Sequence, residues 1–155
     1  MISPWITNTF VDSCAFDPKC NPEDTAATEI FRLHREQNLQ LVVAHSTLKE
    51  IEHPNTPQWV KQEAGSKICS IGVQLTPPEL GLKRKLLALL AGNGKPEKMA
   101  QDAEHIFEAQ KYGSYFVTTD QRLLSRAVDV AAICSVTVLL PSEFLSLVLS
   151  HAKST

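Results

Sequence analysis

Apolar residues recur along the chain at two different spacings, and these predict two kinds of element. Short runs of β-branched and aromatic residues that end abruptly in polar ones predict buried strands. The expected strands cover residues 5–11, 39–43, 115–117 and 136–140. Apolar residues three and four positions apart predict helices between the strands. The expected helices cover residues 22–36, 47–52, 57–68, 77–91, 102–112 and 122–128, with a last one starting at 141.

Residues with strong positional preferences mark where several of these helices start. Thr76 and Glu79 have the spacing of a capping box, in which each side chain satisfies a backbone N–H of the other residue. Asn21 before Pro22 is expected to cap the first helix, and Ser46 the second. Residues 71–75 receive no assignment from the pattern.

The order of the elements predicts an α/β fold. The run from Leu39 to Val43 is almost wholly apolar, as in a parallel strand that is covered on both faces. The 155 residues contain no internal repeat, low-complexity tract or linker, and this length suits one domain. The sequence therefore predicts a single domain over residues 1–155, a three-layer α/β/α fold with a mainly parallel central sheet.

Four acidic residues occupy positions that such a fold brings to one edge of its sheet. Asp12 ends the first strand, Asp120 follows the strand 115–117, Asp102 opens the helix before it, and Glu50 lies on the short helix after the second strand. Ligands bind at the carboxyl ends of the strands in open α/β sheets. Four gathered carboxylates would repel one another strongly without a cation, and their hard oxygens suit Mg²⁺ or Mn²⁺. Such sites support phosphodiester hydrolysis.

The segments that carry these acids resemble the PIN domain, a nuclease fold with a parallel sheet and a carboxylate pocket. They are VDS (residues 11–13), HSTLKEI (45–51), DAEHIFEA (102–109) and YFVTTDQRLL (115–124). The resemblance implies that Asp12, Glu50, Asp102 and Asp120 bind the metal and catalyse the cleavage of single-stranded or structured RNA. It also implies that Ser13, Thr118 and Thr119 help to hold the metal, a water or a phosphate. Many members are toxins of bacterial toxin–antitoxin pairs.

The sequence supports a place in this pocket less strongly for three other polar residues. Arg122 could meet a phosphate just beyond Asp120 or be a surface helix residue, and the sequence leaves both readings open. Glu52 and Asp17, the rivals of Glu50 and Asp12, are expected to be exposed.

The histidines and tryptophans favour structural roles. His45, His53 and His105 lack the close paired spacing of a structural zinc site, and His105 is expected to be a hydrogen-bonding neighbour or core residue. Trp5 and Trp59 are expected to pack rather than to stack on bases.

Composition and charge limit the remaining functions. The net charge of −2 gives no general attraction to nucleic acid, so any RNA contact must be local. The densest basic residues, expected to form a solvated face and loop, are Lys83, Arg84, Lys85, Lys95 and Lys98. No apolar run is long enough to cross a membrane and the N-terminus lacks an export signal, so we expect a cytoplasmic protein with no membrane contact.

The four cysteines are scattered, without a CxxC pair. We expect buried thiols at Cys14, Cys20, Cys69 and Cys134 in preference to a disulfide between the first two.

The leading hypothesis is an endoribonuclease that uses Mg²⁺ or Mn²⁺ and acts on RNA, in some settings as a toxin with an antitoxin-like partner. The alternative is a catalytically weak or inactive PIN-like module that works through RNA or protein binding, including a homodimer face. A phosphate-accepting receiver domain is excluded. It would need adjacent acids at the first strand and a lysine at the last, and the residues around Asp12 and Pro141 supply neither.

Overall fold

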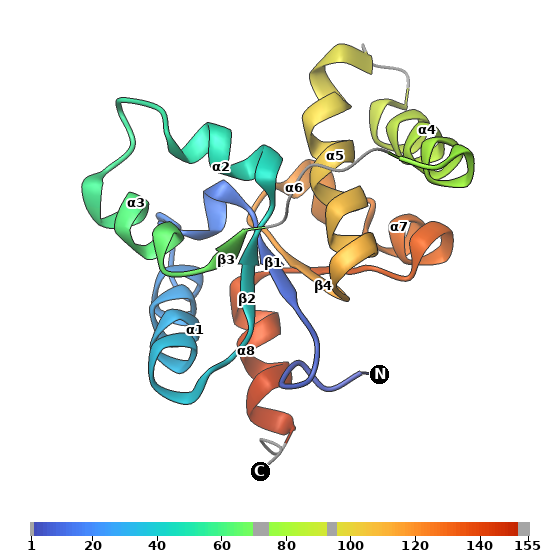
Figure 1. Ribbon diagram of the computed structural model, residues 1–155. Helices are drawn as coiled ribbons and strands as arrows, with labels where there is room; N and C mark the ends of the chain where they lie inside the picture. Colours follow the sequence, from blue (N-terminus) through green and yellow to red (C-terminus); the bar gives the residue numbers. More distant parts are fainter. Residues whose placement is uncertain (1, 70–74, 93–95, 152–155) are drawn as a thin grey trace.

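A computed structural model describes residues 2–69, 75–92 and 96–151, which form a parallel sheet between two layers of helices (Figure 1). The described strands pair in the order β3-β2-β1-β4-β5, and every pairing is parallel. They are β1 (Thr9–Val11), β2 (Leu41–Val43), β3 (Ile68–Cys69), β4 (Tyr115–Val117) and β5 (Thr137–Leu139). The predicted three-layer α/β/α fold is therefore confirmed.

Alternate strand residues point to opposite sides of the sheet and so build two separate cores. On one side, α1 (Glu23–Gln37), α3 (Gln58–Gly65) and α8 (Pro141–Ser150) pack against Val11, Leu41, Val43, Tyr115 and Val117. On the other, α4 (Pro77–Ala91), α5 (Pro96–Tyr112), α6 (Gln121–Leu124) and α7 (Ala127–Cys134) pack against Phe10, Val42, Phe116 and Val138. Strands buried on both faces explain the near-continuous apolar runs in the sequence.

The strand order creates a crevice at one particular place. From β1 the chain continues outward to β2, and from β4 it continues outward in the other direction to β5. Neighbouring strands whose connections diverge in this way leave room for a ligand beyond their carboxyl ends. Two short elements border that place, the 3₁₀ helix η1 (Ser13–Ala15) after β1 and α2 (His45–Ile51) after β2.

The predicted helix caps are partly confirmed. Thr76 and Glu79 form the capping box, with distances of 3.0 Å from Thr76 N to Glu79 Oε1 and 3.4 Å from Glu79 N to Thr76 Oγ1. The prediction for Asn21 was wrong, because α1 starts at Glu23 with Pro22 at its N-cap. The prediction for Ser46 was also wrong, because α2 starts at His45, two residues earlier than expected, and Ser46 lies inside it.

Several predicted element boundaries differ from the structure. The strand expected over 5–11 covers only Thr9–Val11. The helix expected over 57–68 ends at Gly65, and Ile68 instead begins β3, whose backbone is satisfied by pairing with β2. The segment 122–128 belongs to two helices, α6 and α7. Helix α5 begins at Pro96, so Asp102 lies in its second turn rather than near its start. Of the unassigned residues 71–75, residues 71–74 lie outside the described part of the chain.

The expected buried thiols were wrong for the three cysteines whose side chains are described. Cys14 and Cys20 are exposed and Cys134 is half-buried, and all three are free thiols, so no disulfide joins the first two. The side chain of Cys69 lies outside the described part.

Two surface predictions have mixed outcomes. Trp5 packs on the core, but Trp59 is 48% exposed, so its expected packing role was wrong. Arg84 and Lys85 are solvated on α4 as expected, and the side chains of Lys95 and Lys98 lie outside the description. No described helix has the length and apolar character that a membrane span requires.

Candidate metal centre

The crevice between β1 and β4 gathers acids from four separate segments. Asp12 follows β1 as the N-cap of η1, and Asp120 follows β4 as the N-cap of α6. Glu50 reaches the crevice from α2 and Asp102 from α5. The charge of Glu50 helps to raise the pKa of Asp12, and the charges of Asp12 and Asp120 help to raise the pKa of Asp102. The four acids predicted from the sequence therefore lie in one cluster.

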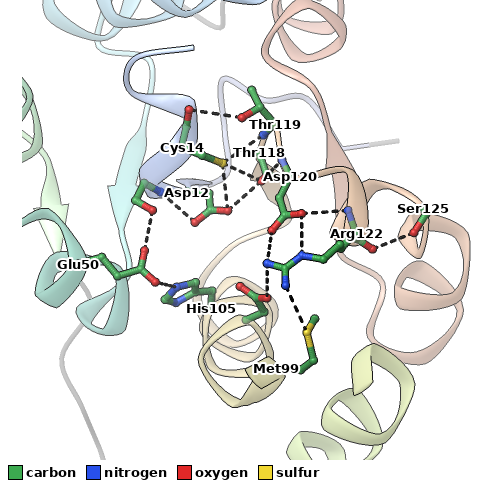
Figure 2. A network of polar contacts seen from close by, with 12 residues as sticks. Asp12, Cys14, Glu50, Met99, His105, Thr118, Thr119, Asp120, Arg122 and Ser125 are labelled. Carbon is green, nitrogen blue, oxygen red and sulfur yellow. Dashed lines mark hydrogen bonds and ion pairs between the residues drawn. The ribbon is translucent and has the colours of Figure 1, made fainter. Parts of the chain in front are cut away.

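Asp12 is buried, and neighbouring donors fix its carboxylate. Ser13 N donates to Oδ1 at 2.9 Å, and Thr118 Oγ1 donates to Oδ2 at 2.8 Å. Thr118 also accepts from Asp120 N at 3.0 Å, so one hydroxyl links the residues that follow β1 and β4 (Figure 2). The Cys14 thiol lies 3.5 Å from Asp12 Oδ2.

Glu50 is held beside Asp12 by two polar neighbours (Figure 2). Ser13 Oγ donates to Glu50 Oε2 at 2.6 Å, while its backbone N–H donates to Asp12. His105 Nε2 lies 3.2 Å from Glu50 Oε1. Ser13 thus connects two of the acids, and His105 fixes the orientation of one of them.

His105 is fully buried, and its other nitrogen is anchored away from the acids. Its Nδ1 lies 2.7 Å from Ser46 Oγ, and Ser46 donates its single hydroxyl hydrogen to Glu108 Oε2 at 2.8 Å. Ser46 must therefore accept the hydrogen bond from His105 Nδ1–H, because a carboxylate can only accept. Burial by itself would lower the pKa of His105, but the hydrogen bond to Glu50 and the charge of Asp12 outweigh it and raise that pKa.

Arg122 lies beside the other two acids and pairs with both of them. Its guanidinium contacts Asp120 through Nη2 at 2.9 Å from Oδ2 and Nε at 3.3 Å from Oδ1, and its Nη2 lies 3.8 Å from Asp102 Oδ2. These contacts hold the pKa of Asp120 below its ordinary value. Among the described residues, no donor forms a hydrogen bond with the Asp102 carboxylate.

Among the described residues, the acids of the cluster carry more negative charge than His105 and Arg122 can balance. Burial raises the pKa of Asp102 to about 6, with further contributions from the charges of Asp12 and Asp120. Burial also raises the pKa of Asp12, and the charge of Glu50 adds to this. The pKa of Glu50 is lowered, because hydrogen bonds from His105 and Ser13 outweigh the effect of burial. The negative charge is therefore least compensated at Asp12 and Asp102.

The donor atoms suit a small divalent cation. One ligand atom each from Asp12, Glu50 and His105 lie within 4.8 Å of one another. Two ligand atoms that each lie about 2.1 Å from Mg²⁺ are at most about 4.2 Å apart. Side-chain movements below about 1 Å would therefore bring these three ligand atoms within reach of one ion. Carboxylate oxygens suit Mg²⁺ and Mn²⁺, whereas an imidazole nitrogen is more typical of sites for Zn²⁺ or Fe²⁺.

The residues around the acids partly match their predicted positions. Ser13 and Thr118 hydrogen-bond to the acids, whereas Thr119 bonds through its N–H and hydroxyl to Cys14. Glu52 is exposed as predicted, and Asp17 is partly exposed and paired with Lys19.

His45, His53 and His105 lie in two kinds of environment. His105 has the hydrogen-bonding role predicted for it, and its Nε2 could hold a cation once it gives up the hydrogen that it donates to Glu50. His45 and His53 are exposed and belong to no such group among the described residues.

The sequence did not predict that Cys14 lies beside Asp12, or that Ser46 links His105 to Glu108. A signal for Glu108 was present, because Asp102, His105 and Glu108 follow one another at three-residue spacing and so share a face of α5.

Comparison with known proteins adds no name to this site, because no protein-family model matches the chain and no curated protein matches its sequence.

Proposed function

We propose that the protein is an endoribonuclease that uses Mg²⁺ or Mn²⁺ to hydrolyse RNA phosphodiester bonds at the carboxylate cluster. The observation that carries this proposal is the gathering of four acids from four segments, in which ligand atoms of Asp12, Glu50 and His105 lie within 4.8 Å of one another. A divalent cation would remove the repulsion that burial and proximity create there. The resemblance of four segments to the PIN domain supports the same chemistry.

The four acids would divide the work of holding the cation. Asp12 and Glu50 are preorganised on one side, because Ser13 donates to both and Thr118 donates to Asp12. Asp102 and Asp120 approach from the other side. Every one of these carboxylates retains lone pairs that its present partners do not use.

Residues beside the cation would orient the water and the phosphate. A divalent cation bound here would lower the pKa of a water molecule and stabilise the charge that develops on the phosphate. The Asp102 carboxylate receives no hydrogen bond from a described residue, so one of its Oδ atoms could accept a hydrogen bond from that water and orient it. Arg122 is 64% exposed and can turn from Asp120 to a phosphate oxygen, for which a guanidinium is well suited.

The proposal extends to partners and location on the strength of the resemblance. A toxin-type member would bind an antitoxin-like protein, which co-expression and co-purification would detect, and a homodimer would appear in sedimentation. We place the protein in the cytoplasm, where the three cysteines with described side chains would stay reduced.

The test combines RNA cleavage with metal binding. Wild-type protein should cleave labelled single-stranded RNA with Mg²⁺ or Mn²⁺ and stop when EDTA is added. Asp12→Asn and Glu50→Gln should lose at least 100-fold in rate, about 2.7 kcal/mol, and should bind Mn²⁺ more weakly in calorimetry. Glu52→Gln is the matched control, because this exposed acid lies two residues from Glu50 and outside the cluster.

The outcomes separate the proposal from its alternative. Cleavage by Asp12→Asn at the wild-type rate in a clean preparation would exclude the cluster as the active site. Tight RNA or protein binding without cleavage under any metal would instead favour a catalytically inactive module.

A further inference from the structure

A cavity of about 450 Å³ lies directly beside the carboxylate cluster, between η1, α2 and the start of α3. Ser13 and Glu50 line both the cavity and the cluster. The cavity therefore continues the candidate metal centre rather than forming a separate surface. Its volume lies within the range of about 300–1,000 Å³ that is usual for small-molecule sites.

Apolar side chains form one part of the cavity wall. They are Phe16, Ile51 and Val60, each at least 96% buried, together with Pro57. A planar, weakly polar group can be covered by such a surface, whereas a hydrated ion would lose its water there without compensation.

Hydrogen-bonding groups form another part, on the loop between α2 and α3. The loop is ordered by its own contacts, with Thr56 N donating to His53 O at 3.0 Å and Asn55 N donating to His53 Nδ1 at 3.1 Å. His53 Nδ1 is therefore an acceptor, and the ring hydrogen of a neutral His53 is on Nε2. The side chains of Asn55 and Thr56 have no hydrogen-bond partner among the described residues. An amide with a free donor and a free acceptor matches the edge of a nucleobase.

The charge of the lining determines which part of an RNA could enter. Only Asp17 and Glu50 of the lining residues are acidic, and none is lysine or arginine. A phosphate would be repelled from this space, whereas a neutral base would not. The phosphate belongs instead at the neighbouring cluster, where a cation would balance its charge.

We propose that this cavity binds one unpaired nucleobase of single-stranded RNA, next to the phosphate that is cleaved. The inference rests on the proposed ribonuclease function and adds to it a binding site for one base of the substrate. A base inside a duplex has its pairing edge occupied and its faces stacked, so only an unpaired base can turn into the cavity. Asn55 reads the edge of the base, and the apolar wall covers its faces.

The binding test uses wild-type protein without divalent cation and measures NMR shifts on addition of the four nucleosides and of ribose 5-phosphate. We expect at least one nucleoside to shift the Asn55 side-chain amide and the His53 ring, and ribose 5-phosphate to shift neither. Asn55→Ala should lower the affinity for that nucleoside about tenfold, because the substitution removes hydrogen bonds to the base. Gln58→Ala, an exposed amide that does not line the cavity, should bind like the wild type.

The cleavage test measures the preference among RNAs that differ only at the base beside the cut. The wild type should prefer one base and should cleave an abasic substrate more slowly, and Asn55→Ala should bring the four rates together. Equal binding of ribose 5-phosphate and nucleosides, or an unchanged preference in Asn55→Ala, would overturn the inference.

The two proposals fail in different ways. If no RNA is cleaved but a nucleoside binds at Asn55, the base site stands and the ribonuclease function falls. If RNA is cleaved but no nucleoside shifts Asn55, the function stands and the base site falls.

Discussion

Replacing Asp102 by asparagine should stabilise the metal-free protein at pH 8. The substitution keeps the size of the side chain and removes one charge from the cluster. The Asp102 side chain is 14% exposed and has no hydrogen bond from a described residue, so little is lost with the carboxylate. Its main attractive contact is Arg122, whose Nη2 lies 3.8 Å away.

The size of the effect follows from the raised pKa of Asp102. The pKa increases from 3.8 to about 6, roughly two units, and each unit corresponds to about 1.36 kcal/mol. We halve the resulting figure of about 3 kcal/mol, because the site borders solvent and screening weakens the repulsion. Asp102→Asn should therefore gain about 1–2 kcal/mol in the free energy of unfolding at pH 8.

The gain should depend on pH in a definite direction. A folded-state pKa above the unfolded value means that ionisation of Asp102 opposes folding. The penalty is fully present above pH 6, decreases as pH falls from about 6 towards 4, and is absent below the unfolded pKa. Urea unfolding of both proteins between pH 4 and pH 8, followed by circular dichroism, measures this difference.

Asp129→Asn is the matched control, because that carboxylate is 56% exposed on α7 and lies outside the cluster. Equal stability of the wild type and Asp102→Asn at pH 8, or a gain that does not change with pH, would refute the idea of uncompensated repulsion in the crevice.

Added Mn²⁺ should reverse the order of stability. A ligand at 100 times its dissociation constant stabilises the folded state by about 2.7 kcal/mol. The wild type should gain this amount, and Asp102→Asn should gain less because it has lost a carboxylate. An identical gain in both proteins would show that Asp102 is not a ligand.

Two further predictions concern the scaffold. Gly113→Ala should lose about 1–3 kcal/mol of unfolding free energy, because its Cβ would lie 2.4 Å from the backbone oxygen of Asn8. Gly81→Ala, in the interior of α4 with nothing within 4 Å, should gain about 0.5–1 kcal/mol, and urea unfolding compares the two. Glu79→Gln should be less stable than the wild type at pH 7, because Lys111 and Thr76 lower the pKa of Glu79 to about 2. That difference should be constant above pH 4.5 and disappear as pH falls towards 2, so parallel acid-dependent curves for both proteins would contradict it.

Local patterns in the sequence determined the layers of this protein. The alternation of Phe10 with Val11, and of Phe116 with its neighbours Tyr115 and Val117, follows directly from the period of a strand. The capping box at Thr76 was equally predictable, because its partners are three residues apart. The acids at strand ends could be named for the same reason, since a parallel sheet brings those ends to one edge.

Contacts between distant segments were decided only by the tertiary structure. Ile68 begins a strand because β2 is available to pair with it, which no local propensity records. Ser46 resembles a helix cap in sequence, but it is buried between His105 and Glu108, 59 and 62 residues further along the chain.

The sequence by itself therefore determined which segments bury apolar side chains and which residue types stand at the ends of the strands. Only the folded chain decided how those ends are linked by Thr118, which acids Arg122 neutralises and where a cavity opens beside Glu50. Local periodicity is a property of neighbouring residues, whereas pairing, burial and charge balance depend on groups that meet only after the chain has folded.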